Sequence, residues 1–221
     1  MRINKYLAAR LGISRRKADA ILQAGRITVD GIAPSAGFDV TDENTVLIDG
    51  RQLPQEKSFT YVLLNKPVGY VCSRDGQGSS SIYDLLPHTF DHLNPVGRLD
   101  KDSSGLLLLT NDGALHNKLT HPSYEKHKEY QITLSKPLGP NDQALIKKGV
   151  LLDDGLSGLD LSLWQSDGRG WIVRMHEGRN RQIRRTFHAL GYKVTSLHRT
   201  HFGDYALGNI AVGKYIEVET P

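Results

Sequence analysis

The residues best suited to chemistry lie in one short stretch, residues 97–113, with the sequence GRLDKDSSGLLLLTNDG. Its first half is polar and carries two carboxylates, Asp100 and Asp102, close to Arg98. Its second half contains four consecutive leucines between turn-forming residues, which predicts a short, fully buried strand. A carboxylate on a loop that leads directly into a core strand is held rigidly, as catalytic and binding groups tend to be. From spacing alone, a turn with a surface ion pair between arginine and aspartate is the commoner arrangement.

Composition limits the class of protein that can position this loop. The chain has 221 residues, which suits one ordinary domain and a small one. Its content of 38% hydrophobic and 24% charged residues is typical of a soluble globular protein. The single cysteine, Cys72, excludes an internal disulfide and a cysteine-cluster zinc site. We find no stretch of membrane-spanning length and no signal or transit peptide, so we expect a cytoplasmic protein.

Positive charge is concentrated in two segments that lie far apart in the sequence. Residues 1–28 contain seven basic residues against one acidic residue, and residues 174–199 have the same composition, so each segment carries +6. Two such segments indicate two surfaces that meet a polyanion. Two solvated helix faces would give the same pattern, and the charge count alone does not separate these alternatives.

The first fifty residues have the pattern of a separate module. Apolar spacing predicts a helix over residues 3–11, and Ser14 can cap a second, basic helix before two short strands. This order, with the sequence GRITVDG, resembles the small RNA-binding domain first known from ribosomal protein S-four. The resemblance implies contacts between RNA phosphates and basic side chains, which would make binding sensitive to salt. The residues expected to make these contacts are Arg2, Lys5, Arg15, Arg16, Lys17 and Arg26.

A polar segment with a proline, residues 51–59, is expected to link this module (residues 1–50) to a second domain over residues 60–221. That domain should begin with a strand, a break at Lys66-Pro67 and another β-like run ending near Cys72. Further along, Asn180 can cap a helix whose apolar residues follow at helical spacing.

Four motifs of the second domain resemble those of RNA pseudouridine synthases of the RsuA type. They are GRLDKDSSGLLLLTNDG, LNKPVGYVCS, the K-E-Y of residues 128–130 and EGRNRQIRR. The resemblance implies an α+β fold: a small α/β RNA-binding domain followed by a synthase domain with a long, mixed, largely antiparallel sheet flanked by helices. It also implies that a uridine in RNA is isomerised without any cofactor or metal.

The resemblance assigns three catalytic residues. Asp100 would attack the sugar or remove a sugar proton, and Tyr130 would stack on the uracil or accept its carbon-five proton. Arg184 would reach Asp100, and a positive charge at close range lowers the pKa of a carboxyl. The target nucleotide must be flipped out of the folded RNA, and basic side chains would hold the displaced backbone. The residues expected to do so are Arg98, Arg179, Arg181 and Arg185.

The expected partner is ribosomal RNA or a ribosome-assembly intermediate, with no membrane involved, and the chain is expected to be a monomer. The EGRNRQIRR motif favours large-subunit over small-subunit RNA slightly. A catalytically inactive RNA-binding or ribosome-assembly protein is the main alternative. A carboxylate-dependent nucleoside hydrolase is less consistent with the sequence, because the sequence offers neither a second positioned acid nor a metal site.

Overall fold

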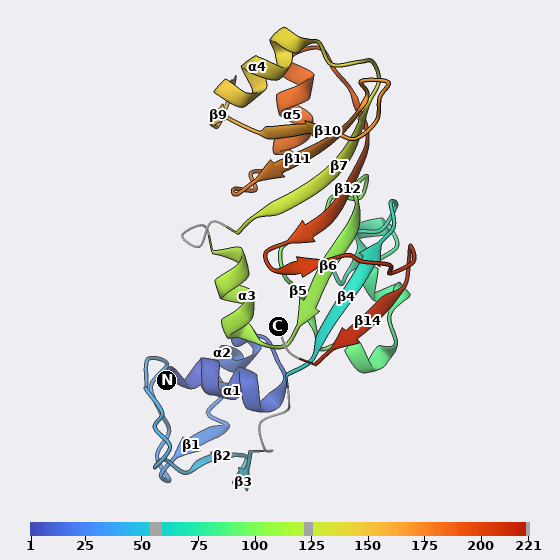
Figure 1. The fold of residues 1–221 in the computed structure, drawn as a ribbon. Helices are drawn as coiled ribbons and strands as arrows, with labels where there is room; N and C mark the ends of the chain where they lie inside the picture. Colours follow the sequence, from blue (N-terminus) through green and yellow to red (C-terminus); the bar gives the residue numbers. More distant parts are fainter. Residues whose placement is uncertain (54–58, 122–125, 220–221) are drawn as a thin grey trace. The chain divides into compact units, whose positions relative to one another are not determined.

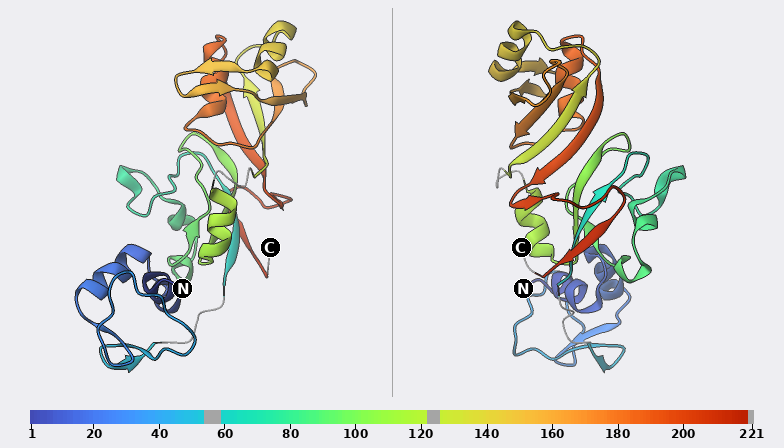
Figure 2. Two further views of the ribbon diagram at one scale, coloured as in Figure 1. Left: turned by 90° about the vertical axis from the view of Figure 1, so that its left-hand side faces the viewer. Right: turned by 45° about the vertical axis from the view of Figure 1, so that its right-hand side comes forward.

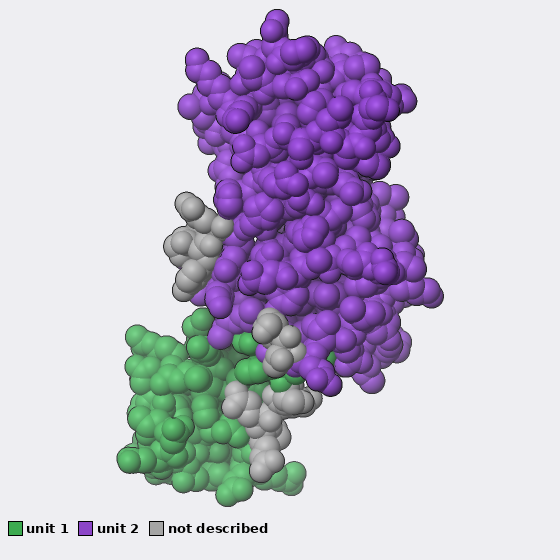
Figure 3. Space-filling model, in the orientation of Figure 1, with its two compact units in different colours: residues 1–60, 111–113 green, residues 61–110, 114–221 purple. Residues whose placement is uncertain are grey.

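The computed structural model describes residues 1–53, 59–121 and 126–219. The chain divides into two compact units, which are coloured separately in Figure 3. Unit 1 contains residues 1–60 with 111–113, and unit 2 contains residues 61–110 and 114–221. Each unit has its own hydrophobic core.

Unit 1 has two helices and a small sheet, as its sequence predicts. Helix α1 ends at Gly12, whose φ of 65° is left-handed, and Ser14 Oγ caps α2 by accepting a hydrogen bond from the Lys17 amide at 3.2 Å. The buried core of this unit includes Ile3 and Leu7 from α1. Its elements are α1 (Ile3–Leu11), α2 (Arg15–Gln23), β1 (Ile27–Val29), β2 (Val46–Ile48) and β3 (Arg51–Gln52).

The expected linker, residues 51–59, is wrong at its beginning. Residues Arg51 and Gln52 form β3, which pairs antiparallel with β2. The turn between them is Asp49-Gly50, and both residues have positive φ angles, 49° and 74°. An Asp-Gly pair with two positive φ angles favours a two-residue hairpin, so the sheet continues past the expected boundary. Residues 54–58 of that linker lie outside the described residues.

Unit 2 is built on one mixed sheet, which confirms the fold expected from the resemblance (Figures 1 and 2). The main strand order is β10-β11-β7-β12-β6-β4-β14, and its neighbours pair antiparallel except for β12 and β6, which are parallel. Helices α4 and α5 lie beside the β10–β7 end of this sheet (Figure 1). The elements are β4 (Tyr61–Lys66), β5 (Asn94–Pro95), β6 (Ser104–Thr110), α3 (Gly113–Thr120), β7 (Lys128–Leu134), α4 (Pro140–Lys148), β8 (Val150–Leu152), β9 (Gly155–Ser157), β10 (Asp160–Leu163), β11 (Gly170–Met175), α5 (Gln182–Ala189), β12 (Val194–Phe202), β13 (Tyr205–Ala206) and β14 (Tyr215–Val218), with short 3₁₀ helices at Gly76–Gly78, Ile82–Leu85 and His88–Phe90.

The four leucines of β6 are buried on both faces of the sheet, as predicted. All four side chains are fully buried. Leu107 and Leu109 belong to one hydrophobic cluster, while Leu106 and Leu108 belong to another. Because side chains alternate along a strand, each pair faces a different layer. The loop with Asp100 therefore leads into one of the most buried elements of the unit.

Two local expectations are wrong. The run ending near Cys72 is not a strand, and only an isolated bridge joins Val71 to Ser81. Pro67 has no amide donor and Gly69 has a φ of 92°, so the chain turns away after β4. Asn180 does not cap α5.

The residue before α5 is Arg181, which has a left-handed φ of 46° and makes no side-chain cap. Instead, the side-chain oxygen of Gln182 accepts a hydrogen bond from the Arg179 amide at 3.1 Å. The sharp left-handed turn places the helix start one residue later than the capping pattern indicates. It also leaves the Arg181 side chain available to contact another segment.

Candidate functional site

A cavity of about 360 Å³ lies in unit 2, where the loop before β6 meets β7, β12 and the start of α5. The three residues expected to be catalytic, Asp100, Tyr130 and Arg184, all line this cavity. The structure therefore brings together residues that are far apart in the sequence. The other charged residues in the lining are Arg98, Lys128, Arg179, Arg181 and Arg199.

The buried ammonium group of Lys66 fixes the loop that carries Asp100. Lys66 ends β4 and its side chain is fully buried. Its Nζ donates hydrogen bonds to the carbonyl oxygens of Asp100 at 3.0 Å and Ser103 at 2.7 Å, and to that of Pro67 at 3.1 Å. Burial lowers the pKa of Lys66 from its ordinary value, because the charged form is deprived of water. Lys66 thus has a structural role, because it ties the end of β4 to the loop that carries Asp100.

The two remaining carbonyl groups of the loop also have partners. The Gly69 amide donates to the Lys101 oxygen at 2.7 Å. Arg184 Nη2 donates to the Asp102 oxygen, also at 2.7 Å. Since all four carbonyl groups of residues 100–103 accept hydrogen bonds, the backbone at Asp100 has little freedom to move.

The arginine within ion-pair distance of Asp100 is Arg181, whereas the resemblance assigns this place to Arg184. Arg181 Nη1 lies 3.4 Å from Asp100 Oδ2, and the same guanidinium forms two hydrogen bonds with Asp102, at 2.9 and 2.7 Å. Arg184 pairs with Asp102 at 3.3 Å and uses its other donors on the carbonyl groups of Asp102 and Val194. Arg184 still interacts electrostatically with Asp100, so its role beside that carboxylate stays a prediction. Arg181 reaches Asp100 because its side chain leaves the left-handed turn before α5 toward the loop.

The two carboxylates of the loop have different environments. Asp102 is held by both arginines, and the hydrogen bonds from Arg181 lower the pKa of its carboxyl. Asp102 is absent from the cavity lining, among the described residues. Asp100 lines the cavity, and the exposed fractions of the two side chains are similar, 40% for Asp100 and 48% for Asp102. Only one of the two carboxylates is therefore open to a group bound in the cavity.

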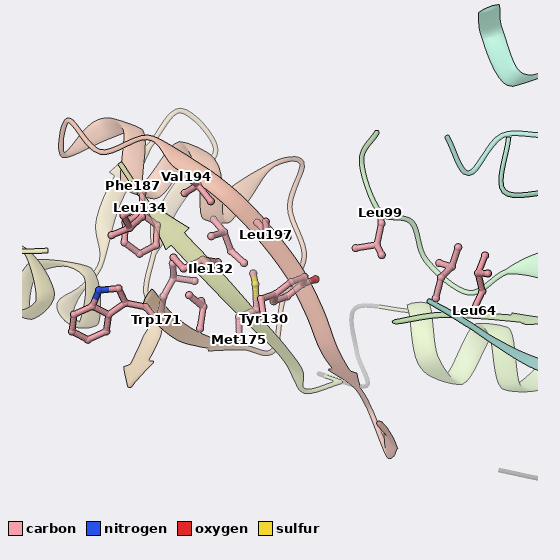
Figure 4. Close-up of a cluster of buried hydrophobic side chains, with 14 of the residues drawn as sticks. Leu64, Leu99, Tyr130, Ile132, Leu134, Trp171, Met175, Phe187, Val194 and Leu197 are labelled. Carbon is pink, nitrogen blue, oxygen red and sulfur yellow. The ribbon is translucent and has the colours of Figure 1, made fainter. Parts of the chain in front are cut away.

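Tyr130 supplies an aromatic wall to the cavity. It lies on β7 and is nearly buried, at 8% exposure. Figure 4 shows it within a cluster of hydrophobic side chains, between Ile132 and Leu99, with its hydroxyl oxygen directed away from Ile132. A planar base could stack against such a ring, which is worth about 1–3 kcal/mol per base.

Two basic residues of the cavity wall, Lys128 and Arg199, were not assigned to the site from the sequence. Arg199 is only 2% exposed, and its Nε donates to the carbonyl oxygen of Leu106 at 2.8 Å. Lys128 is half-buried, and its Nζ donates to the carbonyl oxygen of Glu177 at 3.1 Å. The signal for Arg199 is its position in β12, two residues after buried Leu197, where strand alternation indicates an inward side chain.

Arg179 and Arg185, both expected to bind RNA, have partners within the chain. Both pair with Asp154, at 2.8 and 2.6 Å. Arg179 also donates to the carbonyl oxygens of residues 154–156, so it holds the turn between β8 and β9. Arg98 lines the cavity and is exposed. RNA binding by these three arginines stays a prediction.

All six basic residues expected to bind RNA in unit 1 are exposed: Arg2, Lys5, Arg15, Arg16, Lys17 and Arg26. Some have protein partners as well. Arg26 pairs with Asp49, and Arg15 donates to the Asn4 side chain at 3.3 Å. The exposed donors of α2 are compatible with contacts to phosphate, and RNA binding by these six residues stays a prediction.

In the described part of the chain, no cluster of three histidine, cysteine or carboxylate side chains is arranged to hold a metal ion. Across the same residues, no helix has both the length and the apolar character needed to cross a membrane.

Comparison with known proteins identifies both units. Residues 60–189 match the family described as RNA pseudouridylate synthase, and residues 1–46 match the S4 domain. The chain is 35% identical over 219 residues to ribosomal small subunit pseudouridine synthase A of Salmonella typhimurium, covering 97% of this chain and 95% of the relative. Identity to an uncharacterized RNA pseudouridine synthase of Aquifex aeolicus is 35% over 226 residues, covering 99% and 90% of the two chains.

A solved structure described as a pseudouridylate synthase is also similar. It superposes with a TM-score of 0.71 at 30% sequence identity, covering 99% of this chain and 96% of the other. The similarity thus spans both the sequence and the arrangement of the sheet that carries the cavity. The chain belongs to the RNA pseudouridylate synthase family and carries an S4 domain at its N-terminus.

Proposed function

We propose that the chain converts a specific uridine of ribosomal RNA to pseudouridine, with Asp100 as the catalytic carboxylate. The observation that carries this proposal is the difference between the two loop carboxylates. Asp100 opens into the cavity from an anchored backbone, whereas Asp102 is paired with two arginines. A reactive carboxylate needs access to substrate and a fixed position, and Asp100 has both.

The reaction rearranges bonds within one nucleotide. The bond from the sugar to the uracil nitrogen breaks, the uracil turns, and a new bond forms from the sugar to carbon five. The carbon-five proton is lost and the freed nitrogen gains one, so no cofactor is needed for balance. Asp100 either attacks the sugar or removes a sugar proton, and Tyr130 holds the uracil or accepts the carbon-five proton. Arg181, at 3.4 Å, attracts the ionised carboxylate and orients it.

The proposed substrate is small-subunit ribosomal RNA. The preference for large-subunit RNA expected from the EGRNRQIRR motif finds no support among the relatives, since those of Salmonella typhimurium and Escherichia coli are named as small-subunit enzymes. The exposed basic residues of α2 would contact RNA phosphates and position the substrate without reading its sequence.

Tritium release from carbon-five-labelled uridine tests the reaction directly. We would compare small- and large-subunit ribosomal RNA transcripts, and a small-subunit assembly intermediate, as substrates. Release should occur with small-subunit RNA and fall by at least about 1000-fold in Asp100→Asn, because the reacting group is lost. Asp102→Asn is the matched control and should lose no more than about tenfold, because Asp102 is absent from the described cavity lining and acts on Asp100 through Arg181.

The outcomes separate the alternatives. Asp100→Asn should bind RNA within about threefold of the unchanged chain, because only one exposed side chain is altered. Full activity of this variant would refute the assignment of Asp100. Tight, salt-sensitive binding without tritium release from any substrate would instead favour the inactive RNA-binding protein.

A further inference from the structure

Arg199 is a buried cation without an anionic partner in the described part of the chain. Its side chain is 2% exposed. Its Nε bonds to the Leu106 carbonyl oxygen, while Nη2, which carries two donors, has no hydrogen-bond partner among the described residues. A buried charge is costly unless it is paired, and an unmet buried donor adds to this cost. Such a group is expected where a ligand supplies the missing partner.

A second cation lies close to Arg199 in the same cavity wall. The Arg199 Cζ is 4.8 Å from the centre of the Phe202 ring, and Lys128 Nζ is 5.9 Å from it. All three residues line the cavity. The pKa of Lys128 is lowered, first by burial and then by the positive charge of Arg199. The two cations therefore repel each other, and an anion between them would relieve that repulsion.

The carboxylate that acts on Lys128 does not satisfy this pair of cations. Glu177 acts electrostatically on Lys128, and its side chain is exposed. Its Oε1 already accepts hydrogen bonds from Arg179, at 3.1 Å, and from Gln182. The positive charge on the cavity wall is thus only partly balanced from within the chain.

The register of the sheet puts Arg199 beside the aromatic wall. Arg199 on β12 lies directly opposite Tyr130 on the antiparallel neighbour β7. Side chains of such a pair lie on the same face of the sheet, a few ångströms apart. A nucleotide whose uracil rests on Tyr130 and whose sugar reaches Asp100 brings its phosphate into the same cavity.

We propose that Arg199, together with Lys128, forms a phosphate subsite in the cavity for the uridine nucleotide that is isomerised. This inference rests on the proposed function, because that function places a uridine nucleotide in the cavity. Phosphate is the chemical match, since a guanidinium fork donates two parallel hydrogen bonds to its oxygens and an uncharged base would leave the two cations unbalanced.

Calorimetric titration with uridine, uridine 5′-monophosphate and uridine 3′-monophosphate tests the subsite without turnover. The unchanged chain should bind at least one monophosphate about tenfold or more tightly than uridine, as expected for a charge-assisted pair. Arg199→Gln should remove this preference, Arg199→Lys should keep part of it, and Lys128→Gln should reduce it. The control is Arg169→Gln, because Arg169 is exposed and pairs with Asp167 outside the cavity lining; its preference should be unchanged.

Several results would overturn the subsite. One is that the unchanged chain binds uridine and both monophosphates with equal affinity. A second is that Arg199→Gln still binds the monophosphate more tightly than uridine to the same degree. A third is that Arg199→Gln weakens the binding of uridine and of the monophosphate by the same factor. Thermal unfolding shows whether each variant is folded. If Arg199→Gln is unfolded, Arg199→Lys and Lys128→Gln test the subsite instead. An unaltered preference for monophosphate over uridine in both variants then refutes it. Phosphate preference without tritium release would reject only the proposed isomerisation.

Discussion

Replacing Lys66 by methionine should loosen the loop that presents Asp100. Methionine has an unbranched stem of similar length but no ammonium group, so the cavity it leaves is small. Three carbonyl oxygens, those of Pro67, Asp100 and Ser103, lose a donor. Asp100 keeps one partner, because its carbonyl oxygen also accepts from the Ser103 amide at 3.0 Å.

The size of the effect follows from two opposing contributions. Each hydrogen bond from a charged donor is worth about 1.5–3 kcal/mol, so three bonds contribute about 5–9 kcal/mol. Removing the buried ammonium recovers its desolvation cost of several kcal/mol. We therefore expect the free energy of unfolding of Lys66→Met to fall by about 2–4 kcal/mol. We also expect kcat to fall about 100-fold, since a displacement of about 1 Å at a reacting group has that effect.

Urea unfolding and tritium release measure the two effects. Lys101→Met is the matched control, because Lys101 is an exposed lysine of the Asp100 loop whose ammonium group donates to Ser79 alone among the described residues. Its free energy of unfolding should change by less than about 0.5 kcal/mol. A Lys66→Met chain with stability within about 0.5 kcal/mol of the unchanged chain and kcat within about twofold would refute the reasoning, because both values lie inside the range of a neutral surface change.

The pH dependence gives an independent check on Lys66. Because burial lowers the pKa of Lys66, the folded chain releases this proton at a lower pH than the unfolded chain does. Over that interval the unfolded chain binds more protons, so stability rises with pH up to the ordinary lysine value of 10.5. The difference in unfolding free energy between the unchanged chain and Lys66→Met should rise over this interval. If this difference in unfolding free energy did not change with pH, the buried ammonium group of Lys66 would not have a lowered pKa in the folded chain.

Two further predictions concern backbone packing and the arginines. Gly105→Ala should lower the free energy of unfolding, measured in urea, by about 3 kcal/mol or more. The reason is that Gly105 has a φ of 104° and an added Cβ would lie 2.3 Å from the Arg199 carbonyl oxygen. Gly113→Ala is the control and should change the free energy of unfolding by less than about 1 kcal/mol, because nothing lies within 4 Å of a Cβ added there. Arg181→Ala should lower kcat by about tenfold with little change in stability, because the exposed Arg181 side chain orients Asp100. Arg184→Ala should lower the free energy of unfolding by about 2 kcal/mol in addition to lowering kcat, because it removes a mostly buried side chain that is bonded to two carbonyl groups. Equal behaviour of the two arginine variants in both assays would contradict this division of roles.

Local sequence patterns predict the elements that are determined by neighbouring residues in the sequence. Helix α2 forms where Ser14 can cap it, and β6 forms where four leucines follow a turn. The errors occur where a tertiary contact or a special turn decides. Strand β3 depends on pairing with β2 across Asp49-Gly50, and the start of α5 depends on the left-handed conformation of Arg181.

The candidate site shows the same division. Asp100 and Tyr130 are found because they stand in motifs with a known pattern, and both line the cavity. The closer contact of Arg181 with Asp100 is not predicted, because Arg181 and Arg184 are both basic and only the direction of each side chain distinguishes them. Arg199 is not found either, because its importance comes from strand register and from the lack of a partner.

The parallel pairing of β6 with β12 connects the fold to the site. Gly105 lies opposite Arg199 in this pair, and the absence of a side chain at Gly105 lets the two backbones approach. That approach brings the Leu106 carbonyl oxygen to Arg199 Nε and the end of the Asp100 loop to β12. A glycine in a strand weakens it, so its presence here is explained by the close contact that it permits. Because the Asp100 loop leads into β6 and Arg199 lies on β12, moving either strand would disturb the carboxylate and the proposed phosphate subsite together.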